Sequence, residues 1–401
     1  MSFSVVLFDD CFARERLKPL TSTRPIGNLR VGILTLDQKW SRIFRTEVSY
    51  LTRDYLREKF PLSNSLDQEF LVIHGSVLPN EDLTVELLGL DVGQKLVADD
   101  GDWIAMKFSR IEDFDEQSLQ RAFRIQSSSG CKRLNCPEDI YLNNADQIEF
   151  DLAYLDTDLA PHSALKGNEF VGSAIYIANT AVLHHCFLDS SKGPIYIGAG
   201  AVLEAGTVVY GPVSIGDRCR VKSGTVLYMN VSIGEGSTIC GEINNTVIWG
   251  NSAKGHLGYL GCSVIGEGCN IGAGTSNSNL RNDWKNIQLY DYSEGRMRDT
   301  GLQKCGVIMG DHVMLAINSK INTGTVIGVG CQIAISNFIP KFVLDFSWLT
   351  DGIKDLYIFD HFIGMLKRKA AGKDEAFDAK EERILSSFYK EVKQIIEINQ
   401  H

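Results

Sequence analysis

The chain has 401 residues, of which 44% are hydrophobic and 22% are charged, values that exclude a largely disordered chain and give no sign of a membrane protein. Its 40 Lys and Arg residues against 50 Asp and Glu residues leave a formal net charge of −10, which argues against a broad nucleic-acid-binding surface. The length corresponds to about two or three domains.

The beginning of the chain and its cysteines predict a reduced, cytoplasmic protein. The first ten residues lack a basic n-region and reach Asp9 and Asp10 before an apolar core as long as that of a signal peptide. No stretch reaches the roughly 18 apolar residues of a membrane span, so we expect no membrane partner. The ten cysteines include no C-x-x-C pair, which indicates neither a zinc site nor a compact disulfide framework.

Residues 1–105 predict an α/β domain with a mostly parallel sheet. The apolar runs at residues 4–8 and 70–73 have the length of buried strands, and a helical pattern lies near residues 40–60. We expect residues 106–164 to form a connecting segment.

The peptide R-E-R-L-K-P-L-T-S-T-R-P follows the first strand at residues 14–25. It resembles a degraded form of the sugar nucleotidyltransferase signature, G-x-G-T-R-L-x-P-L-T-x-x-R-P-K. In that signature glycines let backbone N–H groups approach the nucleotide phosphates, while basic side chains neutralise their charge. The resemblance implies that Arg16, Thr21 and Arg24 bind a nucleotide.

Several positions depart from this signature. The two glycine positions hold Phe12 and Arg14, the final lysine position holds Ile26, and Ser76 stands where a magnesium-binding aspartate normally ends a later segment. The metal ligands therefore stay unknown, with Asp9, Asp10 and residues 99–102 as candidates. The domain either transfers a nucleotide with Mg²⁺, binds one without turnover, or only caps the following domain.

Aliphatic residues then recur at every sixth position. The unbroken run is Ile197, Leu203, Val209, Ile215, Val221, Leu227, Ile233 and Ile239. A period of six fits neither a helix nor a long strand. Three six-residue sides make one triangular coil of a left-handed parallel β-helix built of hexapeptide repeats, which we predict for residues 165–340.

Two stretches break the hexad phase. Residues 184–194 predict a loop that leaves one corner, and residues 275–305 predict a longer excursion, where binding groups can be displayed. The peptide K-G-H-L-G-Y-L-G at residues 254–261 precedes the second one and contains His256, an imidazole available as a base. Amides and a lysine follow it and are suited to a polyhydroxylated, anionic ligand.

This peptide and N-I-G-A-G-T at residues 270–275 resemble a bifunctional enzyme family. That family acetylates glucosamine 1-phosphate and then uridylylates the product to UDP-N-acetylglucosamine. The spacing of its acetyltransferase motif is repeated without a gap from His256 to Lys285. A closer likeness, at residues 241–245, 275–280 and 346–348, is to a shorter, divergent branch among sugar nucleotidyltransferase-like proteins.

The resemblance implies acetyl-CoA as a co-substrate and a homotrimer with active sites between subunits. His256 would be the catalytic base that deprotonates the sugar amine. The implied binding residues are Lys222, Tyr259, Asn270 and Lys285 for the sugar 1-phosphate, and Ala273 and Asn279 for acetyl-CoA. Asn244 and Ile317 replace a phosphate-binding lysine and a serine near the thioester, which leaves the sugar and the acyl donor open.

Residues 341–401 predict a C-terminal extension. Apolar residues at helical spacing indicate an amphipathic helix over 376–398, which we expect to cap the solenoid. The leading functional prediction is a fused nucleotidyltransferase and acetyltransferase of sugar-nucleotide synthesis. The alternatives are a uridylyl- or thymidylyltransferase that acts on a sugar phosphate and a nucleoside triphosphate, with the β-helix as an assembly platform, and a non-catalytic sugar-nucleotide-binding protein.

Overall fold

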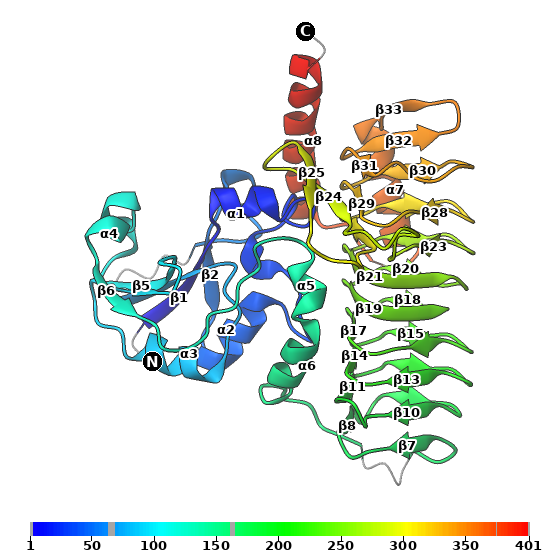
Figure 1. The fold of residues 1–401 in the computed structure, drawn as a ribbon, viewed down its shortest axis with the longest axis horizontal. Helices are drawn as coiled ribbons and strands as arrows, with labels where there is room; N and C mark the ends of the chain where they lie inside the picture. The colour runs from blue at the N-terminus through cyan, green and yellow to red at the C-terminus, as the bar shows by residue number, and fades with distance from the viewer. Residues whose placement is uncertain (1–2, 63–68, 161–164, 374, 400–401) are drawn as a thin grey trace.

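The computed structural model describes residues 3–62, 69–160, 165–373 and 375–399. An N-terminal α/β domain lies beside a long β-solenoid, and a C-terminal helix stands next to the upper coils (Figure 1). This arrangement confirms the predicted fold class. In the part of the chain described, no helix has the length and apolar character of a membrane span.

The N-terminal sheet has six strands in the order β2-β1-β3-β5-β4-β6. They are β1 (Phe3–Phe8), β2 (Val48–Leu51), β3 (Glu69–His74), β4 (Gln94–Val97), β5 (Trp103–Phe108) and β6 (Phe123–Gln126). β1 pairs in parallel with β2 and β3, β4 pairs in parallel with β6, and β5 is antiparallel to both of its neighbours. The expected domain boundary at residue 105 therefore falls inside β5, and β6 lies in the segment expected to be a connection.

The helices of this half are short. They are α1 (Cys11–Arg16), α2 (Leu36–Phe44), α3 (Glu81–Leu88), α4 (Glu116–Arg121), α5 (Asp139–Leu142) and α6 (Asn144–Leu152). The helix predicted near residues 40–60 ends at Phe44, because Arg45 adopts a left-handed φ of 49° and strand β2 follows. α6 touches the solenoid, where the Asn144 side chain donates to Asn230 at 3.0 Å.

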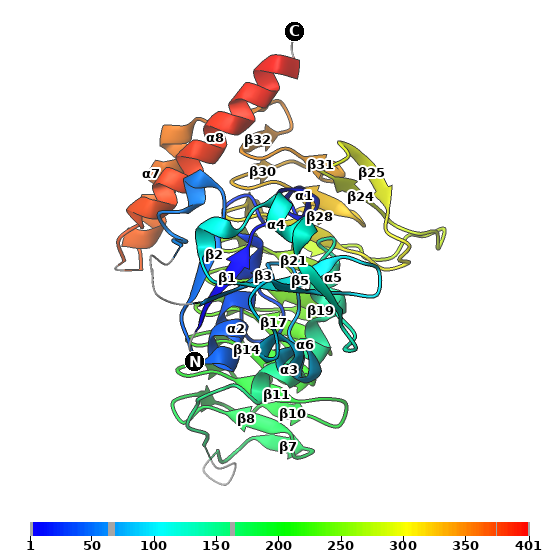
Figure 2. The same cartoon turned by 90° about the vertical axis from the view of Figure 1, so that its left-hand side faces the viewer.

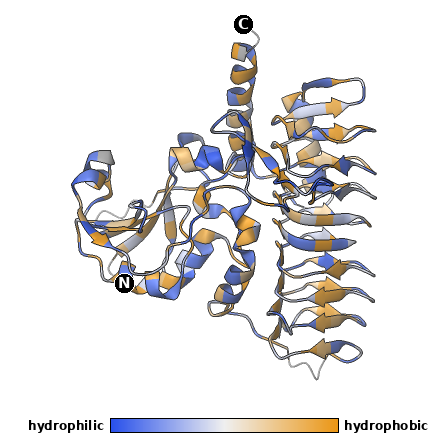
Figure 3. Cartoon of the chain, viewed as in Figure 1, coloured by the Kyte–Doolittle hydropathy of each residue, from blue (hydrophilic) through white to orange (hydrophobic). Residues whose placement is uncertain are grey.

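The solenoid repeats every 18 residues in its regular part, as three hexads per coil predict. Val213 pairs in parallel with Ile195 and with Val231. All eight residues of the predicted hexad run are at most 2% exposed and fill the interior. Figure 3 shows hydrophobic positions recurring in strand after strand of the stack. Burial of one aliphatic side chain per side is thus what holds the coils together.

The solenoid strands form two long sheets of 13 and 10 strands, which are parallel except for the last pair of the 10-stranded sheet. Their bounds are β7 (Glu169–Val171), β8 (Ile175–Ile177), β9 (Val182–Leu183), β10 (Phe187–Asp189), β11 (Ile195–Ile197), β12 (Val202–Leu203), β13 (Val208–Tyr210), β14 (Val213–Ile215), β15 (Arg220–Val221), β16 (Val226–Leu227), β17 (Val231–Ile233), β18 (Thr238–Ile239), β19 (Glu242–Ile248), β20 (Ala253–Lys254), β21 (Tyr259–Ile265), β22 (Asn270–Ile271), β23 (Ser276–Asn277), β26 (Val307–Met309), β27 (Met314–Leu315), β28 (Lys320–Ile321), β29 (Thr325–Ile327), β30 (Gln332–Ala334), β31 (Phe342–Val343), β32 (Ser347–Thr350) and β33 (Lys354–Leu356). Of these, β23 and β28 form a separate two-stranded sheet.

Of the two excursions predicted from the sequence, the structure contains the second. The prediction of a loop over 184–194 was wrong for β10, because Leu188 is fully buried in the solenoid core and β10 continues the ladder. The longer excursion is present. It carries an antiparallel hairpin of β24 (Gln288–Asp291) and β25 (Arg296–Asp299) outside the coil path.

The chain ends in two helices, α7 (Phe359–Ala371) and α8 (Ala379–Asn399). α8 confirms the predicted amphipathic helix, and its Leu385, Phe388 and Val392 pack in one cluster with Phe346 and Phe362. It also contacts the N-terminal domain through a Lys59–Glu381 ion pair. In Figures 1 and 2 it runs along the side of the last coils rather than across their end, so it joins the two halves of the molecule.

Asp345 beneath this helix predicts a pH-dependent stability. It is buried, its carboxylate accepts bonds from the Val329 N–H at 2.7 Å and the Tyr292 hydroxyl at 3.1 Å, and burial raises its pKa from 3.8 to about 6. Because the folded state prefers the protonated carboxyl, the free energy of unfolding falls by about 3 kcal/mol as the pH rises from about 4 to above 6. The Asp345→Asn variant should not show this fall. The melting temperature of the variant, relative to that of the wild type, should therefore be higher at pH 7.5 than at pH 4.5. Parallel pH profiles would contradict the prediction.

Candidate functional site

His256 lies at an exposed corner of the solenoid, between β20 and β21. The next coil passes directly beside it, because the Gly274 N–H donates to the Leu257 carbonyl at 3.1 Å. Ala273 occupies this same corner one coil further on. The imidazole and the small side chain implied in acetyl-CoA binding are therefore placed on neighbouring coils.

Two further predicted residues are brought into contact. The Asn279 amide donates to the Tyr259 hydroxyl at 3.0 Å, across 20 positions of sequence. The Tyr259 backbone N–H donates to the Ser276 hydroxyl at 3.0 Å, which fixes the start of β21. Burial raises the pKa of Tyr259, so its hydroxyl stays protonated at neutral pH and keeps a hydrogen to donate to a ligand.

Lys222 lies beside the same corner, but part of its hydrogen-bonding capacity is used. Its ammonium donates to the Gly255 carbonyl at 2.9 Å, one residue before His256. Asn270 at the start of β22 and Lys285 in the long excursion are both exposed. Neither makes a described side-chain bond to His256 or Tyr259, so their part in the site stays a prediction.

Asn277, one of the amides that follow His256, is not available to a ligand. Its side chain is 4% exposed, accepts from the Gly261 N–H at 2.8 Å and donates to the Gly261 carbonyl at 2.9 Å. It therefore replaces backbone hydrogen bonds between two coils. Asp283, further along, forms an ion pair with Arg281 at 2.6 Å on the surface.

The loop expected to hold a nucleotide is closed around Arg14. This side chain is 1% exposed and pairs with Asp9 at 2.6 Å. It also donates to the carbonyls of Thr21 at 2.5 Å and Arg24 at 2.9 Å, while the Thr21 hydroxyl donates back to the Arg14 carbonyl at 2.7 Å. A guanidinium thus fills the position where the resembling signature has glycine and where phosphate would approach.

Arg24 is directed at the solenoid instead of at the N-terminal sheet. It forms ion pairs with Glu267 and Asp311, each at 2.8 Å, and its guanidinium lies 4.6 Å from the Trp249 ring centroid. The neighbouring Thr23 hydroxyl donates to Asp311 at 2.5 Å. We call this set, Thr23, Arg24, Trp249, Glu267 and Asp311, the interdomain clamp. Of the three residues implied in nucleotide binding, only Arg16 keeps a side chain outside such contacts, beside Phe12.

The carboxylates near this loop do not fit a magnesium site. Asp9 uses one oxygen for the Ile26 N–H at 2.8 Å and the other for Arg14 and for the Thr52 hydroxyl at 2.5 Å. Asp10 caps α1 by accepting the Ala13 N–H at 2.8 Å. Across the described ranges, no group of three or more His, Cys, Asp or Glu side chains is arranged to hold a metal ion.

A cavity of about 530 Å³ opens at the carboxyl ends of β1 and β2. Its charged lining residues are Asp9, Arg14, Glu15, Lys18, Arg53, Asp54, Arg57 and Glu391, the last from α8. Open α/β sheets bind their ligands at this edge of parallel strands. The cavity is therefore the candidate ligand site of the N-terminal domain, although the signature residues Thr21 and Arg24 do not line it.

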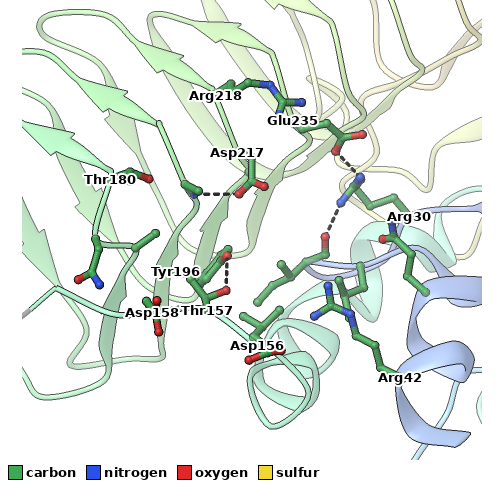
Figure 4. Close-up of a pocket in the computed structure, with 18 residues that line it drawn as sticks. Arg30, Arg42, Asp156, Thr157, Asp158, Thr180, Tyr196, Asp217, Arg218 and Glu235 are labelled. Carbon is green, nitrogen blue, oxygen red and sulfur yellow. Dashed lines mark hydrogen bonds and ion pairs between the residues drawn. The ribbon is translucent and has the colours of Figure 1, made fainter. Parts of the chain in front are cut away.

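A larger cavity of about 620 Å³ lies between the N-terminal domain and the lower coils (Figure 4). Its charged lining residues are Arg30, Arg42 and Arg218 against Asp156, Asp158, Asp217 and Glu235. Arg30 is already paired with Glu235 at 2.6 Å. Since acidic groups outnumber basic ones, this cavity has no excess of positive charge for a phosphate, and we assign no ligand to it.

Comparison with known proteins identifies both halves. Residues 5–159 match the family "Sugar nucleotidyl transferase", and residues 194–228 match "Bacterial transferase hexapeptide (six repeats)". The chain therefore joins a domain of the first type to repeats of the second, which confirms the resemblance seen in its motifs. The family match extends through residues 106–159, which we expected to be a connection.

Curated relatives are similar over part of their length. The chain is 37% identical over 100 residues, 25% of it and 24% of the relative, to "Bifunctional protein GlmU" of Methanocaldococcus jannaschii. It is 39% identical over 92 residues, 23% of it and 22% of the relative, to "Bifunctional sugar-1-phosphate nucleotidylyltransferase/acetyltransferase" of Sulfurisphaera tokodaii. These matches span about a quarter of the length of each relative, and the second relative is an enzyme by its name.

Two solved structures are similar at low identity. AntD, an N-acyltransferase from Bacillus cereus in complex with dTDP and 3-hydroxybutyryl-CoA, is 13% identical with a TM-score of 0.21, covering 55% of this chain and all of that one. UDP-N-acetylglucosamine O-acyltransferase from Moraxella catarrhalis is 13% identical with a TM-score of 0.23, covering 56% and 96%. At these TM-scores the likeness supports no conclusion about function.

Proposed function

We propose that the solenoid transfers an acetyl group from acetyl-CoA to the amine of an amino-sugar 1-phosphate, in the synthesis of a sugar nucleotide. The arrangement of the exposed His256, Ala273 and the Tyr259–Asn279 pair on adjacent coils supports this proposal. The His256 imidazole takes a proton from the sugar amine as the nitrogen attacks the thioester carbonyl. The amide forms as the carbon–sulfur bond breaks, and the imidazole passes the proton to the leaving sulfur, so that CoA departs as the free thiol.

The names of the relatives support the same class of reaction. Among them is a "sugar-1-phosphate nucleotidylyltransferase/acetyltransferase", and the match is to a part of that protein. The phosphate would be held by Lys222, whose ammonium has three hydrogens and uses one on Gly255, and by the exposed Lys285. Backbone N–H groups at the corner would stabilise the oxyanion of the tetrahedral intermediate.

The test of this proposal is release of free thiol from acetyl-CoA, followed with a thiol reagent. We expect release with glucosamine 1-phosphate and little or none with glucosamine or glucosamine 6-phosphate, because the ammonium groups of Lys222 and Lys285 are expected to face a phosphate on carbon 1. Galactosamine 1-phosphate tests the choice of sugar. No thiol release with any amino-sugar 1-phosphate would refute the assignment of the solenoid as an acetyltransferase.

Nucleotidyl transfer by the N-terminal domain is a second candidate. The family match over residues 5–159 and the cavity at the carboxyl ends of β1 and β2 favour it. Thr21 and Arg24 already form hydrogen bonds or ion pairs within the protein. The phosphates would therefore have to be bound by Lys18, Arg53 and Arg57. Labelled UTP with N-acetylglucosamine 1-phosphate and Mg²⁺ tests it. If none of the four nucleotides releases pyrophosphate, the domain either binds a nucleotide without turnover or only caps the solenoid.

We also propose that the protein works as a homotrimer. Leu257 and Ile317, at the corner that carries His256, are 69% and 68% exposed. Exposed apolar side chains beside a polar site are typical of an interface. Light scattering should give the mass of three chains, and a monomer at micromolar concentration would contradict this proposal.

A further inference from the structure

One interior position of the solenoid holds a charged residue where the equivalent positions of other coils hold aliphatic ones. The strands β9, β12, β15, β18, β20, β22, β27, β30 and β32 stack in register, so one residue of each occupies the same interior column. That column contains Leu183, Leu203, Val221, Ile239, Lys254, Ile271, Leu315, Ile333 and Leu349. Eight members are aliphatic, and the ninth is a lysine two residues before His256.

Lys254 is charged but has no carboxylate partner among the described residues. It is 1% exposed, and its ammonium donates to the carbonyl of His256 and, at 3.4 Å, to that of Cys240. Burial lowers its pKa to about 8. A buried ammonium is unfavourable unless hydrogen bonds replace its lost hydration, so an aliphatic residue would suit the packing of this column better.

The His256 carbonyl is one of several at this corner of the solenoid that receive no backbone N–H from the next coil. The carbonyls of His185, Ala205 and Ala273 each accept one, from Gly206, Gly224 and Asn318, whereas no such bond is described at the equivalent Ser223, Gly241 and Ile317. At the His256 corner the N–H of Gly274 goes to Leu257 instead. The His256 carbonyl is thus left without its interstrand donor, and the Lys254 ammonium takes that place.

The backbone on both sides of the imidazole is held in a similar way. Lys222 reaches the Gly255 carbonyl from outside, while Lys254 reaches the His256 carbonyl from the interior. Gly258 then leaves the corner with a φ of +136°, and a Cβ there would lie 2.1 Å from the Thr275 carbonyl oxygen. The peptide that carries His256 is therefore an irregular turn whose shape depends on side-chain donors.

We propose that Lys254 is a positioning residue, whose buried ammonium fixes the turn that presents the His256 imidazole at the corner of the solenoid. This inference rests on the proposed acetyl transfer for its effect on catalysis. The contact between the lysine and the turn is independent of that activity. A lysine that only filled space would be replaceable by the aliphatic residues found elsewhere in its column.

The decisive variant is Lys254→Met, which keeps the length of the side chain and removes the ammonium. Its melting temperature should equal or exceed that of the wild type, because a buried charge is lost. The kcat for acetyl transfer should fall by about tenfold or more, with KM for both substrates nearly unchanged, since the imidazole is displaced while the binding groups remain. A kcat within about twofold of the wild type would overturn the proposal.

Leu203→Met is the matched control, because Leu203 is fully buried in the same column and lies on a coil without site residues. It should leave kcat unchanged. If it lowers kcat as much as Lys254→Met does, the effect comes from methionine in the column, and the positioning role is refuted.

A second measurement separates this inference from the proposed function. Amide hydrogen exchange over residues 255–258 should become faster in Lys254→Met, while exchange around Ala205 stays as in the wild type. Faster exchange in a protein without acetyltransferase activity would support the contact and refute the proposed reaction. Unchanged exchange would refute the positioning role, whatever the activity of the wild type.

Discussion

Replacing His256 by alanine is expected to lower acetyl transfer by about 10²- to 10⁴-fold, the usual contribution of a general base. The imidazole lies on an exposed corner, so its removal leaves the solenoid core intact. The melting temperature should therefore stay within a degree or so of the wild type. The expected loss is in kcat, measured as thiol release at saturating acetyl-CoA.

A second histidine of the solenoid provides the control. His185 is exposed and follows the interior residue Leu183 by two positions, as His256 follows Lys254. In the described part of the chain it has no neighbouring hydrogen-bonded pair like Tyr259 and Asn279, so His185→Ala should keep full activity. If His256→Ala also retains turnover, His256 is not the base, and the catalytic role must be reassigned to another group.

Replacing Arg24 by methionine is expected to destabilise the protein by about 3–5 kcal/mol, the cost of breaking a buried ion pair. Asp311 is 1% exposed, and without Arg24 its remaining donors among the described residues are the Thr23 hydroxyl and the Glu267 N–H. The guanidinium would also leave the face of Trp249. Denaturant unfolding measures the loss of free energy.

Two comparison variants make the second prediction specific. Arg24→Met combined with Asp311→Asn should recover part of the loss, because no unpaired buried charge remains. Arg30→Met breaks another contact between the domains, but its partner Glu235 has a side chain that is 42% exposed, so a loss of about 1 kcal/mol or less is expected. Equal losses for Arg24→Met and Arg30→Met would show that the interdomain clamp contributes no more to the free energy of unfolding than the more exposed Arg30–Glu235 pair.

The interior residues of the solenoid could be predicted from the sequence because they recur at a fixed spacing along the chain. Each coil needs one aliphatic side chain per side at a fixed spacing, so Ile197 to Ile239 predict the coil without knowledge of any neighbour. Leu188 was missed because it falls midway between residues 185 and 191, the positions that continue the hexad series of Ile197 toward the N-terminus. β6 was missed because Phe123 and its neighbours are largely exposed and lack the buried pattern by which strands are recognised.

The candidate site was predictable in part. His256, Tyr259 and Asn279 stand in a recognisable peptide, and the coil geometry brings the latter two together. Asn277 resembles them in sequence but faces inward, because the side-chain period in a strand alternates between faces. Arg24 looked like a nucleotide ligand because its partners Glu267 and Asp311 are more than 240 positions away.

The fold class, the repeat and the corner on which His256 stands follow from the sequence, since these depend on spacing along the chain. Which polar groups remain free for chemistry depends on tertiary contacts. These contacts assign Arg14 and Arg24 to internal bonds and Lys254 to the turn at His256. The reason is physical: a charged side chain withdrawn from water must find partners, and those partners come from whichever distant segments the fold places beside it.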